Sequence, residues 1–290
     1  MVPGVGHRVR YGGRRVPDVS HRGRYGDPRP AGLDALPLPP RPMPSRFGLR
    51  PLKSWRYVGV YGPELMLCVA SVRIGPARQA FWAVWDRSRL YERTALGHGR
   101  VRLAPGRVRV TEPAVQIDLS LDEVAGVEAI CLSGRAYAWT RKQGGIRARG
   151  RVMIDGRPHE VDAAAIVDDT SAYYERHTHW QWCAGVGVST DGVRAAWNLV
   201  AGVNDPPTDS ERTIWIDGEP QEPPPSSFAS DLSGVDDLCF HAEATRRRNE
   251  NLLLVRSRYV QPFGTFSGRL AGGIELAEGY GVMESHDVLW

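Results

Sequence analysis

Short runs in which apolar and polar residues alternate repeat along this chain from Trp55 almost to its C-terminus. In residues 101–103, 107–110 and 115–121, for example, every second residue is apolar. A period of two places successive side chains on opposite faces, so each run predicts a half-buried antiparallel strand. The runs end at turn signals, which include three Asp-Gly pairs typical of hairpins: Asp155-Gly156, Asp191-Gly192 and Asp217-Gly218.

The number of these runs limits the architecture. We count about fifteen predicted strands and no amphipathic helix beyond a turn near residues 168–174. One barrel of about eight strands cannot use them all, whereas evenly spaced strands are typical of closed or stacked sheets. We therefore predict an all-β protein with two consecutive antiparallel barrels or bent sandwiches, in residues 51–160 and 161–290.

Residues 1–50 differ from the rest in composition. They contain nine of the 22 prolines and eight of the 32 glycines, and end in a proline-rich stretch at residues 37–44. Such a segment forms neither a helix nor a central strand. It is predicted to be a disordered or extended leader, largely irregular, either mobile or lying as a strap over a barrel.

The leader also accounts for the basic character of the chain. It holds ten Arg and three Asp, a net charge of +7, so the total of +4 leaves −3 for residues 51–290. The predicted barrels have no Lys/Arg stripe interleaved with aromatic residues, and we expect no nucleic-acid partner. The oligomeric state is not predicted by the sequence.

The four cysteines lie more than fifty residues apart and form no C-x-x-C pair, so they predict reduced, buried side chains of a cytoplasmic protein. There is no apolar signal-peptide region, and no apolar run approaches the roughly 18 residues of a membrane helix. Integral membrane association is not expected. Glycine-rich phosphate loops, G-x-S-x-G and H-E-x-x-H are also absent from the sequence, and we expect no cofactor.

The densest polar and aromatic run is His177-Thr-His-Trp-Gln-Trp-Cys183. On a strand, His177 and His179 share one face with Gln181, whereas Trp180 and Trp182 share the other. The nine tryptophans exceed what a core of this size requires, and indoles can form the walls of an apolar pocket. Trp180, Trp182, Trp197 and His177 are therefore predicted ligand contacts.

Asn198 lies in an otherwise apolar run, where a buried amide has to be hydrogen-bonded. It is either a structural residue or a ligand contact. Glu211 is more readily explained as a structural partner of Arg194 or of a histidine.

Glu284 and His286 stand two apart, as do His177 and His179. If the two strands met, these four side chains could surround a transition metal. The simpler reading is that they make hydrogen bonds within the sheet, and we predict no metal site. Asp168, next to Asp169, is either a carboxylate for acid chemistry or part of a turn.

The sequence resembles the bacterial family catalogued as domain of unknown function 2804. The resemblance covers roughly residues 50–290 and rests on an ordered set of blocks: residues 178–187, 191–192, 197–202, 210–218, 261–268 and 281–286, with Trp290. Through its G-x-x-E-x-H ending, that family is similar, more distantly, to the lipocalin-like carotenoid hydratases and tocopherol cyclases. The resemblance implies two lipocalin-like (calycin-like) barrels and a lipid or isoprenoid ligand.

Two functional hypotheses follow. In the first, the protein binds a small lipophilic ligand, as a carrier or as a cofactor-free hydratase, cyclase or isomerase. Protonation of a carbon–carbon double bond requires an acid in a dry pocket, and the candidates are Glu284 or Asp168 as the acid, with His179 and His286 as its partners. In the second, the protein is a non-catalytic structural or interaction protein with a Trp-rich β core.

Overall fold

The computed structural model describes residues 10–11, 14–15, 20–33, 36–133, 135–252 and 255–290. Within these ranges the chain forms antiparallel strands and no helix, which confirms the all-β prediction. No helix long and apolar enough to cross a membrane is found in them either. Two short hairpins lie outside the main sheets: β1 (Arg10–Tyr11) with β2 (Arg14–Arg15), and β4 (Arg46–Phe47) with β5 (Arg50–Pro51).

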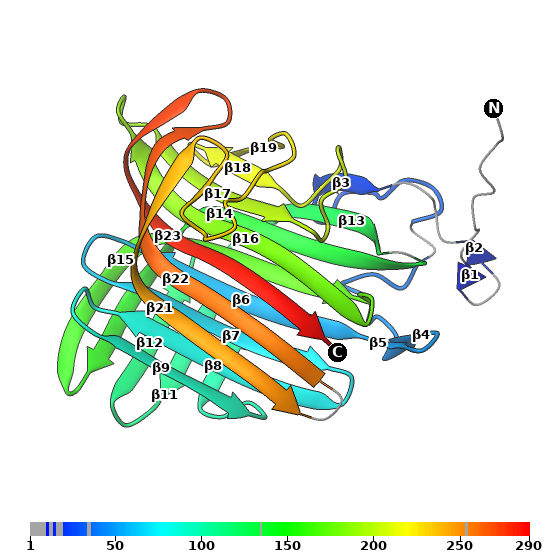
Figure 1. Cartoon of the computed structure of the whole chain (residues 1–290), viewed down its shortest axis with the longest axis horizontal. Coiled ribbons are helices and arrows are strands. Elements are labelled where there is room, and N and C mark those ends of the chain that lie inside the picture. Colours follow the sequence, from blue (N-terminus) through cyan, green and yellow to red (C-terminus); the bar gives the residue numbers. More distant parts are fainter. Residues whose placement is uncertain (1–9, 12–13, 16–19, 34–35, 134, 253–254) are drawn as a thin grey trace.

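The first sheet has eleven strands (Figure 1). They are β3 (His21–Arg24), β6 (Lys53–Tyr61), β7 (Met66–Ile74), β8 (Ala77–Trp85), β9 (Leu90–Leu96), β10 (Val101–Ala104), β11 (Arg107–Thr111), β12 (Val115–Leu121), β13 (Val127–Ser133), β14 (Ala136–Ile154) and β15 (Arg157–Ala172). The main order is β10-β11-β12-β14-β15-β6-β7-β8-β9. The first half of β14 pairs with β13 and its second half with β12.

This sheet curls until its ends meet. β14 has a bulge between Gly144 and Ile146, which bends the strand, and β10 at one end of the order lies against β7 and β8 near the other. The inside is filled by aliphatic side chains such as Val58, Val69 and Leu119. The first barrel is therefore packed with its own core.

The second sheet has eight strands in the order β19-β18-β17-β16-β23-β22-β21-β20. Their bounds are β16 (His177–Ser189), β17 (Arg194–Ala201), β18 (Thr213–Ile216), β19 (Glu219–Gln221), β20 (Gly234–Val235), β21 (Leu238–Leu252), β22 (Val255–Leu270) and β23 (Ile274–Leu289). β21, β22 and β23 are long, bent strands that cross in front of β6–β8 in the view of Figure 1.

The two sheets share a core. In β6, Val58 and Val60 face the interior of the first barrel, while the alternate residues Tyr57 and Tyr61 pack with Trp182 of the second sheet. The outer wall of the first barrel is therefore one wall of the space enclosed by the second sheet. The first sheet ends with β15 at Ala172 and the second begins with β16 at His177. The division predicted at residue 160 stays a prediction.

The described part of the leader is extended. β3 pairs with the edge of β13, and three leucines, Leu33, Leu36 and Leu38, are buried against Trp139 and Tyr173. The Arg29 Nε also donates to Glu128 Oε2 at 2.9 Å. Residues 20–33 and 36–50 thus form a strap across the first barrel; the other leader residues lie outside the described ranges or in the β1–β2 hairpin.

Candidate functional site

A cavity of about 370 Å³ lies between the two sheets. Its volume is within the range of small-molecule sites, roughly 300–1,000 Å³. Most of its wall is apolar or aromatic. The aromatic members of the lining are Trp55, Tyr57, Phe81, Trp180, Trp182, Tyr259 and Trp290, together with the imidazole of His286.

Glu284 lines this cavity, and only 8% of its surface is exposed. Its carboxylate accepts hydrogen bonds from Trp180 Nε1 at 2.9 Å, from the Tyr259 hydroxyl at 2.9 Å and from Gln261 Nε2 at 3.0 Å. Burial raises the pKa of Glu284 to about 7, although the hydrogen bonds from Tyr259 and Trp180 oppose that rise. A pKa near neutral allows the group to hold a proton or release it under physiological conditions.

Strand register brings these groups together. β16 and β23 pair so that Trp182 is opposite Glu284 and Trp180 is opposite His286, all on the face toward the cavity. Arg246 orients Gln261, because Arg246 Nη1 donates to Gln261 Oε1 at 3.3 Å. The amide nitrogen of Gln261 therefore points to Glu284 and donates to its carboxylate. Arg246 is buried and bonded in turn to Glu92 Oε2 at 2.8 Å.

His286 lies beside Glu284 on the same strand face. Its Nε2 is 2.8 Å from Ser257 Oγ, and its ring centroid is 4.4 Å from that of Trp180. Burial lowers the pKa of His286 to about 3, so the imidazole is neutral in the folded protein. The side chain of His286 is therefore an uncharged polar part of the cavity wall at neutral pH.

A second polar group lies on the cavity wall around Asp168. Lys142 Nζ forms ion pairs with Asp168 Oδ1 at 2.5 Å and with Glu211 Oε2 at 3.3 Å. Thr170 and Trp55 also donate to Asp168, at 2.8 and 3.1 Å. Burial raises the pKa of Glu211 to about 7 against the opposing effect of Lys142.

Four of the predicted site residues thus meet on the cavity wall with Glu284: Asp168, Trp180, Trp182 and His286. Asp168 lies in strand β15, which places it in a strand and not in the alternative turn. Asn198 is fully buried and does not line the cavity. Its Oδ1 accepts from Trp182 Nε1 at 2.8 Å and its Nδ2 donates to the Glu211 carbonyl at 3.0 Å, so Asn198 positions the Trp182 ring.

The other predicted residues lie elsewhere. Trp197 packs in the core on the opposite side of the second sheet, with its Nε1 3.2 Å from Cys183 Sγ. His177 and His179 are exposed, and His177 pairs with Asp287 at 2.7 Å. β16 and β23 are neighbours, yet Glu284 and His286 face the cavity while the two histidines of β16 alternate with the cavity-facing tryptophans. The four side chains do not converge, and the described residues contain no His, Cys, Asp or Glu cluster suited to a metal.

The sequence analysis missed three residues that line the cavity, Tyr57, Arg246 and Tyr259. It also missed two residues that bind the carboxylates of the wall from behind the lining, Lys142 and Gln261. Glu211 pairs with Lys142 and not with Arg194 or a histidine, which corrects the partner expected from sequence. A usable signal exists for Lys142, because it falls on the inward face of the run that contains Ala138 and Thr140. A charged residue at an apolar position of a strand marks a buried ion pair or a site.

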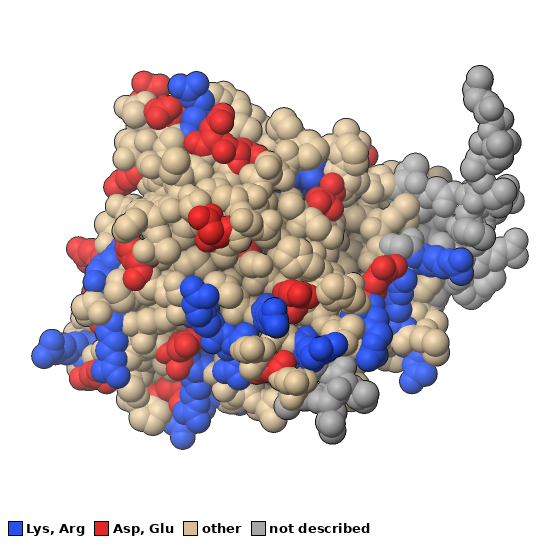
Figure 2. Space-filling view, viewed as in Figure 1, with Lys and Arg blue, Asp and Glu red and all other residues tan. Residues whose placement is uncertain are grey.

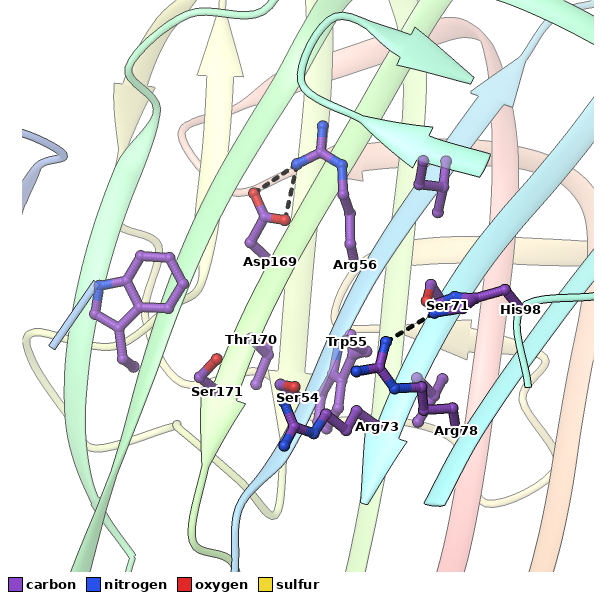
Figure 3. A pocket seen from close by; sticks show the side chains of 13 residues that line it. Ser54, Trp55, Arg56, Ser71, Arg73, Arg78, His98, Asp169, Thr170 and Ser171 are labelled. Carbon is purple, nitrogen blue, oxygen red and sulfur yellow. Dashed lines mark hydrogen bonds and ion pairs between the residues drawn. The ribbon is translucent and has the colours of Figure 1, made fainter. Parts of the chain in front are cut away.

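A second hollow, of about 340 Å³, opens on the outside of the protein at the mouth of the first barrel. Figure 3 shows Arg73 and Arg78 next to each other there, with Arg78 Nη1 2.7 Å from His98 Nε2. Arg56, another residue that lines the hollow, donates hydrogen bonds to Asp169. Arg73, Arg78 and His98 are exposed, so the hollow lacks the dry environment of the cavity between the sheets.

The sequence and the fold were compared with known proteins. No curated protein matches the chain. Similar solved structures include a candidate AttH of Nitrosomonas europaea (12% identity, TM-score 0.47, 87% of this chain and 98% of that chain). CghA with Sch210972 is also similar, with 10% identity and a TM-score of 0.46 over 93% of this chain and 97% of that chain. The kievitone hydratase of Nectria haematococca has 9% identity and a TM-score of 0.46 over 80% of this chain and 88% of that chain. At these identities the likeness concerns the arrangement of strands alone.

Residues 91–222 match the family model described as Domain of unknown function (DUF2804). The match runs from β9 in the first sheet to the end of β19 in the second, so it spans the point where the chain passes from one sheet to the other. It is shorter than the stretch over which the sequence blocks resemble that family. Over residues 91–222, the chain is therefore similar to the DUF2804 family.

Proposed function

We propose that the protein binds a lipophilic small molecule in the cavity between its sheets and that Glu284 donates a proton to it. One observation carries the proposal: a buried carboxyl group with a pKa of about 7 is held by three hydrogen-bond donors in a wall made largely of aromatic rings. Acids tuned in this way are effective near neutral pH.

The chemistry that fits is proton-initiated reaction of an alkene. The electron pair of the double bond would take the proton of Glu284, so that a C–H bond forms at one alkene carbon as the carboxyl O–H bond breaks. This leaves a carboxylate on Glu284 and a cation on the other alkene carbon. The indoles of Trp180 and Trp182 line the cavity and can stabilise this cation through their faces. Loss of a neighbouring proton to Glu284 gives an isomer, and addition of water followed by proton loss gives a hydrate. Attack by a second double bond closes a ring and moves the cation, which then loses a proton to the Glu284 carboxylate.

The other ionisable residues have different roles in this proposal. Asp168 is bound by an ammonium group, an indole and a hydroxyl, an arrangement that suits an anchor more than a proton donor. His286 would shape the wall beside Glu284. His179 is exposed on the other face of β16 and has no part in the chemistry.

Binding and proton transfer can be tested separately. We expect organic extracts of the purified protein to contain a lipophilic compound by mass spectrometry, and all-trans-retinol or linoleic acid to quench the tryptophan fluorescence at micromolar concentration. In D₂O, deuterium should enter an alkene ligand in the presence of the wild-type protein, and Glu284→Gln should reduce the rate at least about 100-fold because general acid catalysis contributes 10²–10⁴.

His177→Ala is the matched control, since His177 is a polar residue on the outer face of the same sheet. It should bind and react as the wild type does. Purified protein that contains no lipophilic compound and binds neither retinol nor linoleic acid would contradict the proposal and favour the alternative of an interaction protein. Binding without any deuterium exchange would restrict the function to ligand binding.

A further inference from the structure

We propose that the cavity wall formed by Asn204, Glu211 and Asp168 binds a hydrogen-bond-donating head group, a hydroxyl or an ammonium, at one end of an otherwise lipophilic ligand. This inference rests on the proposed ligand cavity and adds the class of ligand and its orientation. It concerns a part of the wall that the proton-transfer chemistry of Glu284 does not use.

Asn204 gives the first observation. It lines the cavity, its exposed fraction is 6%, and its Oδ1 has no hydrogen-bond partner among the described residues. Its Nδ2 is committed, because it donates to the Tyr174 hydroxyl at 2.6 Å and to Glu211 Oε2 at 3.0 Å. The carbonyl oxygen of this amide is therefore a buried acceptor that a ligand could satisfy.

The charges around Asn204 point to the same chemistry. Asp168 and Glu211 both line the cavity, whereas their shared cation, Lys142, is not part of the lining. The surface that a ligand meets here consists of acceptors. A hydroxyl or ammonium could donate to them, while a carboxylate would meet negative charge and an ether would leave Asn204 unsatisfied.

The aromatic residues next to these acceptors fit a donor group on an apolar body. The ring of Trp55 is stacked against Tyr174, at 6.0 Å between centroids, and against Trp180, at 6.3 Å. Aromatic faces attract both apolar groups and cations. The head group would therefore lie between acceptors and indole faces.

The cationic residues of the cavity lie on other strands. Arg78 belongs to β8 and both Arg246 and Arg248 to β21, whereas Asp168 is on β15 and Asn204 follows β17. β15 and β8 are separated by β6 and β7 in the first sheet, and β17 and β21 by three strands in the second. Figure 2 shows Lys and Arg side chains gathered over the lower part of this face, where β21 and β22 run in Figure 1. This separation would give the bound molecule one orientation, with its apolar part passing Glu284 on β23.

Four probes with an unbranched ten-carbon chain test the head group: 1-decanol, decylamine, decanoate and decyl methyl ether. Their affinities can be measured by displacement of 1-anilinonaphthalene-8-sulfonate. We expect decanol, decylamine or both to bind the wild type at least tenfold more tightly than decanoate and the ether. The two donor probes separate a hydroxyl site from an ammonium site.

Asn204→Gly is the variant of choice, because Asn204 has φ of +52°, which glycine adopts readily, and its backbone carbonyl still accepts from the Glu211 amide. It should reduce the preference for the donor probes to less than twofold and leave the affinity for the ether within twofold of the wild type. Glu211→Gln should weaken decylamine more than decanol. Circular dichroism melting verifies that each variant is folded, and His177→Ala, on the face away from the cavity, should keep the wild-type preference.

The two proposals fail in different ways. If all four probes bind the wild type with similar affinity, the cavity is a ligand site and the inference about the head group is wrong. If none of them binds, the ether included, the proposed lipophilic site is itself wrong and the inference with it. Retention of the full preference by folded Asn204→Gly would also overturn the inference.

Discussion

At the scale of single residues, the unusual feature is a cavity in which polar side chains are fixed by other polar side chains. Gln261 accepts a hydrogen bond from Arg246 and donates one to Glu284. Asn198 likewise accepts a hydrogen bond from Trp182 and donates one to the Glu211 carbonyl. A buried network of this kind restricts each side chain to one arrangement. In the proposed function, Glu284 would thus be oriented before a ligand enters.

The ionisation of Glu284 makes stability depend on pH. Its pKa is about 7 in the folded chain against an ordinary 4.5, so the folded state binds more protons between these values. Stability from this group is present below pH 4.5 and is lost as pH rises toward and past 7, a loss of about 3 kcal/mol. We expect Glu284→Gln to flatten the urea-unfolding free energy between pH 5 and 8 relative to the wild type. An unchanged slope in the variant would mean that Glu284 is not the titrating group.

At the scale of elements, the strap of the leader is held by a few apolar side chains. Leu36 and Leu38 are 2% and 0% exposed, and they pack with Tyr137 and Trp139 of β14. The sequence predicted an extended leader from its prolines and glycines, which exclude a helix. It could not show which leucines are buried, since a segment without periodicity carries no signal for the face that packs.

We expect Leu38→Ala to lower the free energy of unfolding by about 2–5 kcal/mol, the usual loss for a large aliphatic side chain removed from a core. Leu49→Ala is the matched control, because Leu49 lies in the same leader and is 100% exposed. Urea denaturation followed by tryptophan fluorescence measures both. Equal, small effects of the two substitutions would show that the strap does not stabilise the barrel.

At the scale of the whole molecule, the two sheets share an apolar cluster in addition to the core that each sheet has of its own. Tyr57, Tyr61 and Met66 of the first sheet belong to the same apolar cluster as Trp180 and Trp182 of the second. Folding of either sheet therefore depends on the apolar surface of the other.

We expect the full chain to unfold in one cooperative transition, with the same midpoint by far-ultraviolet circular dichroism and by tryptophan fluorescence. Trp182→Ala, which removes a ring from the shared cluster, should lower that midpoint for both signals together, with a loss of about 3–5 kcal/mol. Two transitions with different midpoints, or a shift in only one signal, would indicate that the sheets unfold independently.

The strand class and the faces of β16 were predictable because a period of two is a local property. Trp180 and Trp182 face the cavity while Gln181 and Cys183 face away, as the alternation indicated. What the sequence could not supply is the pairing of distant strands. Tyr259, Gln261 and Arg246 meet Glu284 and each other only through the order β23-β22-β21, and Lys142 meets Glu211 only across the two sheets. Such contacts depend on topology, which single-sequence periodicity does not contain.

β6 and β7 are walls of two compartments at once, since their alternate side chains face the barrel interior and the ligand cavity. A one-residue insertion in β6 would turn Tyr57 and Tyr61 toward the barrel interior and Val58 and Val60 toward the cavity. It would therefore disrupt the packing of the barrel and the lining of the cavity. If the cavity binds a ligand as proposed, relatives of this protein would change their ligand preference by exchanging side chains on the cavity face. Changes in chain length are expected to collect in the turns, and the spacing within these two strands is expected to remain constant through evolution.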